Sequence, residues 1–231
     1  MSNTAAKPHP DFYAAARFNM VESQLRPNKV INEKLLDIIG RLPREAFVPA
    51  DQKSQAYSDN DISVGYGRKM LAPMTLARMI MALNLQDEDR VLDIGPATGY
   101  SSAILNDLAG EIIALESDAA LTRQLQQNKI DFLLENTRLV QGSLSDGYAA
   151  ASPYNAIIIE GAAQWIPEKI INQLAEGGRM VCVVYPEGDL HGKIGEARLY
   201  TKQAKAIIEQ KLFDTAAPLL PGFVTRPKFV F

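Results

Sequence analysis

The sequence predicts an α/β fold in which a doubly wound, mostly parallel sheet follows an N-terminal helical extension. First, strand-like and helix-like segments alternate through the second half of the chain, which is typical of a parallel sheet with crossover helices. Second, the strand-like runs 197–202 and 206–213 are too close together for a parallel crossover, so they should form an antiparallel hairpin. Third, the chain before residue 42 has helical periodicity.

The predicted elements before the sheet are mainly helical. Residues 12–25 carry apolar side chains at helical spacing, and Pro27 ends the run. A second helix is predicted over 32–41, with Asn32 as its N-cap. Residues 51–69 are polar and contain glycines, which predicts a long loop of a kind that often carries function. Residues 73–85 then predict an amphipathic helix that leads into the sheet.

From residue 86 onward the segments alternate regularly. Strands are predicted at 90–95, 111–116, 137–141, 155–160 and 178–185, with helices near 99–109, 118–129 and 167–175. This divides the chain into an extension, 1–85, and a core, 86–231, which we expect to form one structural unit.

Composition limits the classes of function. The chain has 231 residues, 47% of them hydrophobic, and a net charge of −3, so it has no overall basic field to attract nucleic acid or an anionic membrane. The N-terminus lacks the apolar core of a signal peptide, and no run approaches the roughly 18 apolar residues of a membrane span. We therefore expect a cytoplasmic protein with neither nucleic acid nor membrane as a partner. Cys182, the single cysteine, lies in a strand-like run and is predicted to be a core thiol.

The candidate ligand site begins at the turn after the strand 90–95. A dinucleotide fingerprint has glycines at the first, third and sixth positions, but counting from Gly95 these positions hold Ala97 and Tyr100. Gly95, Ala97 and Gly99, spaced at every second residue behind Asp93, instead resemble the G-x-G-x-G turn of S-adenosylmethionine methyltransferases, with one glycine replaced.

The chemistry of that cofactor agrees with the acids nearby. S-adenosylmethionine has no pyrophosphate; it carries an ammonium, a carboxylate, a sulfonium and a ribose diol, and Asp93 suits its cationic end. Glu116 ends the next predicted strand, about 20 residues further on, where a carboxylate can accept hydrogen bonds from both ribose hydroxyls. The alternative is that the two glycines merely close a strand-to-helix turn and that Asp93 and Glu116 are solvated strand ends.

Several segments together resemble the protein-L-isoaspartate (D-aspartate) O-methyltransferase family, in particular its proteobacterial group. They are MVESQLR (20–26), PREAFVP (43–49), AYSD (56–59), the turn at Asp93, PYNAI (153–157), EGAA (160–163), and QL (173–174) with GGR (177–179). The resemblance extends from about residue 18 to residue 223. It implies a Rossmann-like class I methyltransferase core, S-adenosylmethionine as cofactor, and protein repair by methyl esterification of the free carboxyl of L-isoaspartyl residues in damaged proteins or peptides.

The resemblance also implies site residues. Around the cofactor it places Asp93, Gly95, Pro96, Ala97, Gly99, Tyr100, Glu116, Ser117, Gly142, Ser143, Leu144 and Glu160. Around the substrate it places Met70, Leu71, Ala72, Pro73, Gly161, Ala162 and Ala163. Within these sets Glu116 would hold the ribose, the turn 142–144 the adenine, and 160–163 would lie beside the transferred methyl group.

The sequence departs from the family pattern at the substrate loop. The family loop, Thr-Ile-Ser-x-Pro-His, covers the substrate carboxylate; here the matching residues 69–74 place Leu71 at the hydroxyl, Met74 at the histidine and Leu76 at a second histidine position. No catalytic residue is therefore assignable. Met70, Leu71 and Met74 either form an apolar substrate lip or pack against the N-terminal helices.

Two further departures affect the cofactor side. Ala97 replaces the middle glycine, adding a methyl group where the backbone should approach the ligand, and Ser143 replaces the aspartate that usually binds the adenine amine.

Methyl transfer to a carboxylate needs no general base, because a free carboxyl with a pKa near ~4 is already ionised at neutral pH. This agrees with a chain whose two histidines, His9 and His191, lie in no motif and are predicted at the surface. No metal site is predicted.

Alternative functions remain. One is a methyltransferase with a different acceptor, and another is a non-catalytic cofactor-binding relative. Nucleic-acid methylation is disfavoured because 160–163 lacks the Asn/Asp-Pro-Pro-Tyr/Phe of base-methylating enzymes, and Arg68 and Lys69 are interpreted as solvated loop charges. The tail 226–231 either reaches the active site or covers a sheet edge.

Overall fold

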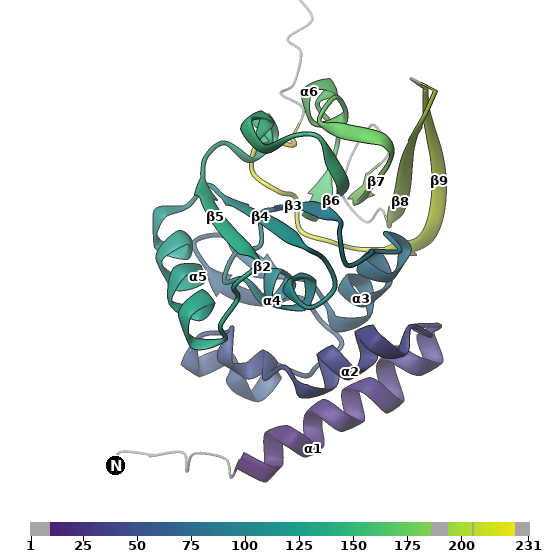
Figure 1. The fold of residues 1–231 in the computed structure, drawn as a ribbon. Coiled ribbons are helices and arrows are strands. Elements are labelled where there is room, and N and C mark those ends of the chain that lie inside the picture. Colours follow the sequence, from purple (N-terminus) through teal and green to yellow (C-terminus); the bar gives the residue numbers. More distant parts are fainter. Residues whose placement is uncertain (1–9, 186–193, 205, 225–231) are drawn as a thin grey trace, which may run out of the picture.

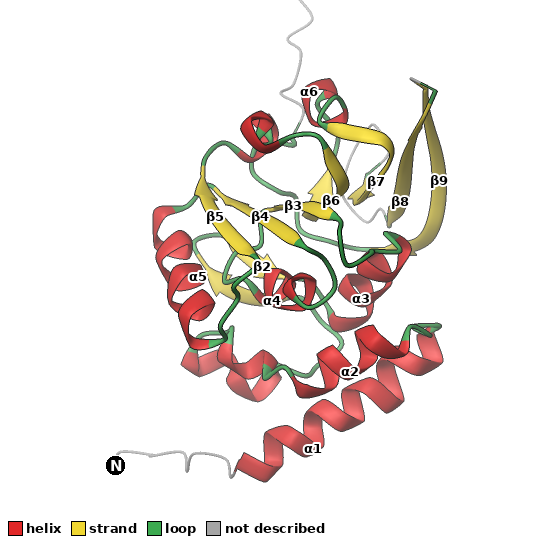
Figure 2. Ribbon diagram, in the orientation of Figure 1, coloured by secondary structure: helices red, strands yellow, loops and turns green. Residues whose placement is uncertain are grey.

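The computed structural model describes residues 10–185, 194–204 and 206–224 (Figure 1). The predictions for His9, His191 and the tail 226–231 fall outside these residues. Within the described chain, a central sheet has helices on both faces, with most of them, including the N-terminal ones, gathered on one face and α6 on the other (Figure 2).

A seven-stranded sheet has the order β5-β4-β3-β6-β7-β8-β9. The strands are β3 (Arg90–Ile94), β4 (Glu111–Glu116), β5 (Thr137–Gln141), β6 (Tyr154–Ala163), β7 (Leu174–Val184), β8 (Gly195–Gln203) and β9 (Ala206–Thr215). The first five are parallel, and β8 and β9 add antiparallel strands at the edge. The predicted doubly wound sheet with its C-terminal hairpin is confirmed.

Alternate residues of the central strands enter two hydrophobic clusters, one on each face of the sheet. The larger cluster joins Val91, Ile112 and Val181 to α3 (Pro73–Ala82), α4 (Tyr100–Asn106) and the N-terminal residues. The smaller one joins Leu92, Ile113 and the buried thiol of Cys182 to α6 (Glu168–Ile171). The burial of Cys182 raises the pKa of its thiol, as expected of a core cysteine.

The helix predicted over 167–175 is shorter than expected, since α6 ends at Ile171 and Leu174 already belongs to β7. The physical reason is strand pairing, because the Tyr154 N–H donates to the carbonyl of Gln173 at 2.8 Å and Tyr154 is in register with Leu174. The parallel ladder thus begins where helical spacing alone would extend the helix. Helix α5 (Ala119–Asp131) matches its prediction closely.

The N-terminal extension is helical as predicted. Helix α1 (Pro10–Met20) continues through a π-helical turn, Val21–Leu25, and a 3₁₀ turn, Arg26–Asn28, which contains Pro27. Helix α2 (Glu33–Arg41) begins at Asn32, whose side chain accepts a hydrogen bond from the Leu35 N–H at 2.9 Å. Leu25, Leu36 and Phe47 join the larger hydrophobic cluster, so the extension packs on the core of the sheet.

The predicted long loop 51–69 is wrong in part. It contains a 3₁₀ helix, Ala50–Gln55, and an antiparallel hairpin of β1 (Ile62–Gly65) and β2 (Arg68–Met70). Side chains alternate between buried and exposed along both strands, which is a period of two that the short, polar segment conceals. In the described part of the chain, no helix is long and apolar enough to cross a membrane.

Replacing Asn32 with alanine should lower the free energy of unfolding by about 1 kcal/mol, because the side-chain acceptor for the first turn of α2 is lost. Urea denaturation followed by circular dichroism measures the change. Asn32→Asp, which keeps an acceptor oxygen, is the control and should stay close to wild type. Equal losses in both variants would contradict the capping role.

Candidate active site at the carboxyl edge of the sheet

The strand order reverses at β3, which has β4 on one side and β6 on the other. In doubly wound sheets the crevice at such a reversal, at the carboxyl ends of the strands, is where ligands bind. Ile94 at the end of β3 is in register with Leu115 of β4 and Ile159 of β6. Glu116 and Glu160 each follow one of these partners directly, so both acids lie at the same edge as Asp93.

A bulge in β6 positions Glu160. Between Ile158 and Ala162 this strand advances four residues while β7 advances two, from Val181 to Val183. Extra residues in one strand bend it and re-aim its side chains, a device that is common beside functional sites. The bulge therefore lies in the segment that the sequence placed beside the transferred methyl group.

The turn after β3 is held by left-handed backbone conformations, with φ of 77° at Gly95, 53° at Ala97 and 91° at Gly99. A β-carbon at Gly99 would lie 2.9 Å from Cγ of Leu125, so only glycine fits there. Ala97 adopts its conformation with a side chain, which confirms that this position can lose its glycine without losing the turn. Pro96 and Tyr100 are buried in the same turn.

Asp93 is fully buried, and its Oδ2 accepts hydrogen bonds from the hydroxyls of Ser101 at 2.9 Å and Ser102 at 2.7 Å. Its Oδ1 has no hydrogen-bond partner within the described chain. Burial raises the pKa of Asp93 to about 7, although the two hydroxyls oppose that shift. At neutral pH this carboxyl is therefore divided between its neutral and charged forms.

Glu160 is also buried beside the crevice. It is 6% exposed, and no hydrogen-bond partner for its Oε1 is found among the described residues. Burial, with a further contribution from the charge of Asp93, raises the pKa of Glu160 well above its ordinary value. Two buried acids with unpartnered oxygens at one crevice are suited to receive a cation.

Glu116 is also fully buried, so the alternative of solvated strand ends is wrong. Its Oε2 accepts from the Ala97 N–H at 3.0 Å, and its Oε1 accepts from the N–H groups of Ser117 at 2.7 Å and Asp118 at 3.1 Å. The carboxylate is thereby held by the cofactor turn and by the start of α5.

Arg68 forms an ion pair with Glu116, with its Nη1 at 2.8 Å from Oε1 and 3.1 Å from Oε2. Its Nη2 donates to the Gly95 carbonyl at 2.6 Å. The interpretation of Arg68 as a solvated loop charge is wrong, because the residue is 4% exposed; the strand β2 turns Arg68 inward and Lys69 outward. Arg68 and Lys69 are adjacent and both charged, so the sequence carries no signal that tells which of the two is buried.

The residues assigned to adenine, 142–144, directly follow β5, which pairs with β4. The Gly142 N–H donates to the Glu116 carbonyl at 3.0 Å, Leu144 is buried, and Ser143 and Ser117 are exposed. The structure therefore brings this group beside Glu116.

The substrate-side residues fall into two sets. Met70, Leu71 and Pro73 are buried, and Arg44 donates from Nη2 to the Leu71 carbonyl at 2.6 Å. The Ala72 N–H donates to Asp61 at 2.8 Å. Met70 and Leu71 belong to the hydrophobic cluster that contains the N-terminal helices, which favours the packing interpretation of these side chains over the apolar lip.

The second set, Gly161, Ala162 and Ala163, is covered by the chain after β9. The Ala162 N–H donates to the Pro218 carbonyl at 2.8 Å, and the Leu220 N–H donates to the Ala162 carbonyl at 2.9 Å. A β-carbon at Gly161 would lie 3.2 Å from Cβ of Leu220, and one at Gly95 would lie 3.0 Å from its Cδ1. Leu220 thus covers the crevice, and sequence reasoning missed it because its partners lie far away in the chain.

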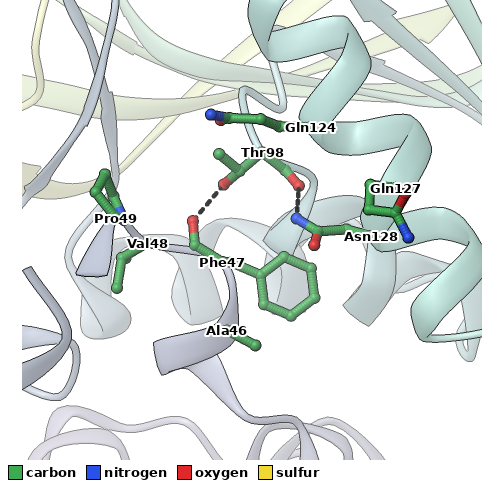
Figure 3. Close-up of a pocket in the computed structure, with 8 residues that line it drawn as sticks. All are labelled: Ala46, Phe47, Val48, Pro49, Thr98, Gln124, Gln127 and Asn128. Carbon is green, nitrogen blue, oxygen red and sulfur yellow. Dashed lines mark hydrogen bonds between the residues drawn. The ribbon is translucent and has the colours of Figure 1, made fainter.

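A separate pocket of about 240 Å³ lies beside the turn (Figure 3). It is lined by Ala46, Phe47, Val48, Pro49, Thr98, Gln124, Gln127 and Asn128. The hydroxyl of Thr98 donates to the Phe47 carbonyl at 2.7 Å, and Asn128 donates to the Thr98 carbonyl at 2.8 Å. These bonds hold the turn between the N-terminal segment and α5, and the pocket is smaller than most ligand sites.

S-adenosylmethionine fits the residues at the crevice. The free oxygens of Asp93 and Glu160 suit its ammonium, and the small residues of the turn allow close approach. Glu116 is placed for the ribose, on the condition that Arg68 gives up its present bonds. Within the described chain no group of acids, histidines or cysteines could hold a metal ion.

Known proteins match over most of the chain. A family profile described as "Protein-L-isoaspartate(D-aspartate) O-methyltransferase (PCMT)" matches residues 16–216. The chain belongs to this family. It is 38% identical over 174 residues to a protein-L-isoaspartate O-methyltransferase of Methylorubrum populi, covering 75% of this chain and 82% of the relative. A protein of the same name from Synechococcus is 34% identical, covering 75% of this chain and 71% of that one.

Two solved structures show the same fold. A protein-L-isoaspartate O-methyltransferase superposes with a TM-score of 0.77 at 22% identity; the match covers 89% of this chain and 66% of that one. A Plasmodium falciparum protein described as a putative member, in complex with S-adenosyl-L-homocysteine, gives 0.72 at 19% identity over 89% and 96% of the two chains. The predicted family and fold are confirmed, and with the family the S-adenosylmethionine-dependent O-methyltransferase class.

Binding of S-adenosylhomocysteine at pH 7 should release protons, because an ammonium beside Asp93 and Glu160 stabilises their charged forms and lowers their pKa values. Affinity should accordingly rise as the pH increases through 7. Calorimetry in buffers of different ionisation enthalpy counts the protons. 5′-Methylthioadenosine, which lacks the amino-acid part, is the control, and equal release with both ligands would contradict this role of the acids.

Proposed function

We propose that this protein methylates the free α-carboxyl of L-isoaspartyl residues in damaged, flexible protein segments. The observation that carries the proposal is the meeting of Asp93, Glu116 and Glu160 at the strand-order reversal of a chain that belongs to the isoaspartate methyltransferase family. S-adenosylmethionine would supply a methyl group on a sulfonium. An acceptor oxygen would attack the methyl carbon in line with the carbon–sulfur bond, and the sulfur would keep the electron pair of that bond.

The residues of this chain bind and orient. We assign Asp93 and Glu160 to the ammonium, Glu116 to the ribose, and Gly142, Ser143 and Leu144 to the adenine. The buried acids support the first assignment, because they gain a counter-charge when a cation binds. Because the acceptor is already a carboxylate, alignment and proximity are sufficient and no base is required. Leu220 and the segment 217–223 exclude water from the crevice.

A methyltransferase with a different acceptor is the second candidate. The observation that favours it is Leu71, an apolar side chain that is 1% exposed where the family has a hydroxyl. We propose that neither nucleic acid nor a membrane is a partner, in keeping with the acidic composition. The cytoplasmic location stays a prediction.

The acceptor can be tested directly. We expect radiolabelled methyl transfer to an L-isoaspartyl peptide at least about tenfold faster than to its normal aspartyl isomer, because the two present their carboxylates differently to a rigid site. Methyl esters are counted by their volatility after mild base treatment. Equal, negligible labelling of both peptides would overturn the isoaspartyl acceptor and leave the other candidate.

The role of position 71 can be separated from packing with two variants. Leu71→Ser and Leu71→Ala should each cost about 2–4 kcal/mol of folding free energy, because they leave a similar cavity in the core. Serine alone restores a hydroxyl, so we expect Leu71→Ser to label the isoaspartyl peptide several-fold faster than Leu71→Ala, at a temperature where both are folded. Equal rates would mean that a hydroxyl at this position does not reach the acceptor.

A further inference from the structure

We infer that Arg68 is a carboxylate-binding residue of the active site, and that it leaves Glu116 for a ligand carboxylate when the ribose takes its place. The inference rests on the proposed function for the identity of the acceptor. Its starting point is that a buried cation lies in the crevice, on the two groups that the cofactor needs, the Glu116 carboxylate and the Gly95 turn.

The first step is a count of acceptor positions on Glu116. A carboxylate offers about four lone-pair positions. Three backbone N–H groups already use Glu116, from Ala97, Ser117 and Asp118, and the Ser117 hydroxyl adds a longer bond at 3.3 Å that rotation of its side chain can release. Arg68 Nη1 lies within bonding distance of both oxygens. The backbone donors are fixed by the turn and by the start of α5. A ribose diol can therefore bind Glu116 only if Arg68 withdraws.

The second step concerns the space at Gly95. A β-carbon built on this glycine would lie 2.6 Å from Nη2 of Arg68, so the guanidinium rests directly against the backbone that a ligand would approach. Arg68 thus lies between the ribose end of the site, at Glu116, and the turn that leads to Asp93.

The third step is that the hairpin tip directly before Arg68 is open, whereas the chain after Arg68 is anchored. The tip of the hairpin is Gly65-Tyr66-Gly67, and a β-carbon on either glycine would meet no atom within 4 Å. β1 and β2 pair with each other in a sheet of their own. After β2, the Leu71 carbonyl is bound by Arg44 and the Ala72 N–H by Asp61. Displacement of Arg68 therefore need not disturb the start of α3.

The fourth step identifies the ligand group. A buried guanidinium that loses its carboxylate is costly and needs a new anion. Both reactants offer a carboxylate, one on the amino-acid part of the cofactor and one on the acceptor, and a guanidinium matches this group with two parallel hydrogen bonds. Arg68 would then couple ribose binding to carboxylate binding, and such coupling is reciprocal.

The test uses the full-length protein, Arg68→Gln, and Lys69→Gln as the matched control, since Lys69 is the exposed neighbour on the same strand. 5′-Methylthioadenosine carries the ribose but no carboxylate, so Arg68→Gln should bind it at least about fivefold more tightly than wild type. S-adenosylhomocysteine carries a carboxylate as well as the ribose. If the cofactor supplies the anion, the affinity advantage of S-adenosylhomocysteine over methylthioadenosine should be smaller in Arg68→Gln than in wild type, by a similar factor. Lys69→Gln should behave as wild type.

If the acceptor supplies the anion, that advantage should be unchanged, and the dissociation constant of the isoaspartyl peptide in the presence of S-adenosylhomocysteine should rise at least about fivefold. Arg68→Lys, which keeps the charge without the fork, guards against misfolding of the glutamine variant and should give intermediate values. The inference would be overturned if Arg68→Gln and Arg68→Lys both bound methylthioadenosine with wild-type affinity. It would also be overturned if they bound it more tightly but showed no loss of affinity for the carboxylate of either S-adenosylhomocysteine or the isoaspartyl peptide. The methylthioadenosine arm needs no turnover, so failed labelling would overturn the proposed function alone.

Discussion

The reversal of strand order at β3 is the constraint on which the site depends. Because β4 and β6 flank β3, residues near the carboxyl ends of three strands meet at one crevice, and three carboxylates converge there without any being near another in sequence. Burying acids that are partly neutral at physiological pH weakens folding, since their charged forms are desolvated. Some loss of folding stability is expected at a site that is built to bind a ligand.

The charges of the crevice explain why Arg68 is there. Three buried acids at one crevice would repel one another, and the protein reduces this repulsion in two ways. Arg68 neutralises Glu116 by an ion pair, and the raised pKa values of Asp93 and Glu160 favour their uncharged forms. Under the proposed assignments, a cofactor that brings an ammonium would change this balance at both places, because the ammonium would substitute for protons at two acids while its ribose would compete with Arg68 at the third.

The sequence was sufficient for features whose causes are local or periodic. The alternating segments predicted the sheet, Asn32 predicted the start of α2, and the spacing of Gly95 and Gly99 behind Asp93 predicted the kind of ligand. The contact of Arg68 with Glu116 joins residues 48 positions apart, and Leu220 reaches Gly161 from beyond the last strand. Neither contact leaves a periodic signal, so charge was mistaken for exposure at Arg68 and the cover at Leu220 was missed.

The apolar residue at 71 and the cation at 68 are connected by the geometry of one short segment. Arg44 binds the Leu71 carbonyl, and the Leu71 side chain packs in the hydrophobic core. Three residues earlier, β2 turns Arg68 into the crevice. A guanidinium gives a carboxylate two parallel hydrogen bonds and a formal counter-charge, whereas a neutral hydroxyl gives it one hydrogen bond. A site that lacks the family hydroxyl at position 71 can therefore hold a ligand carboxylate through Arg68, at the other end of this segment. Arg68 must first leave Glu116 to do so.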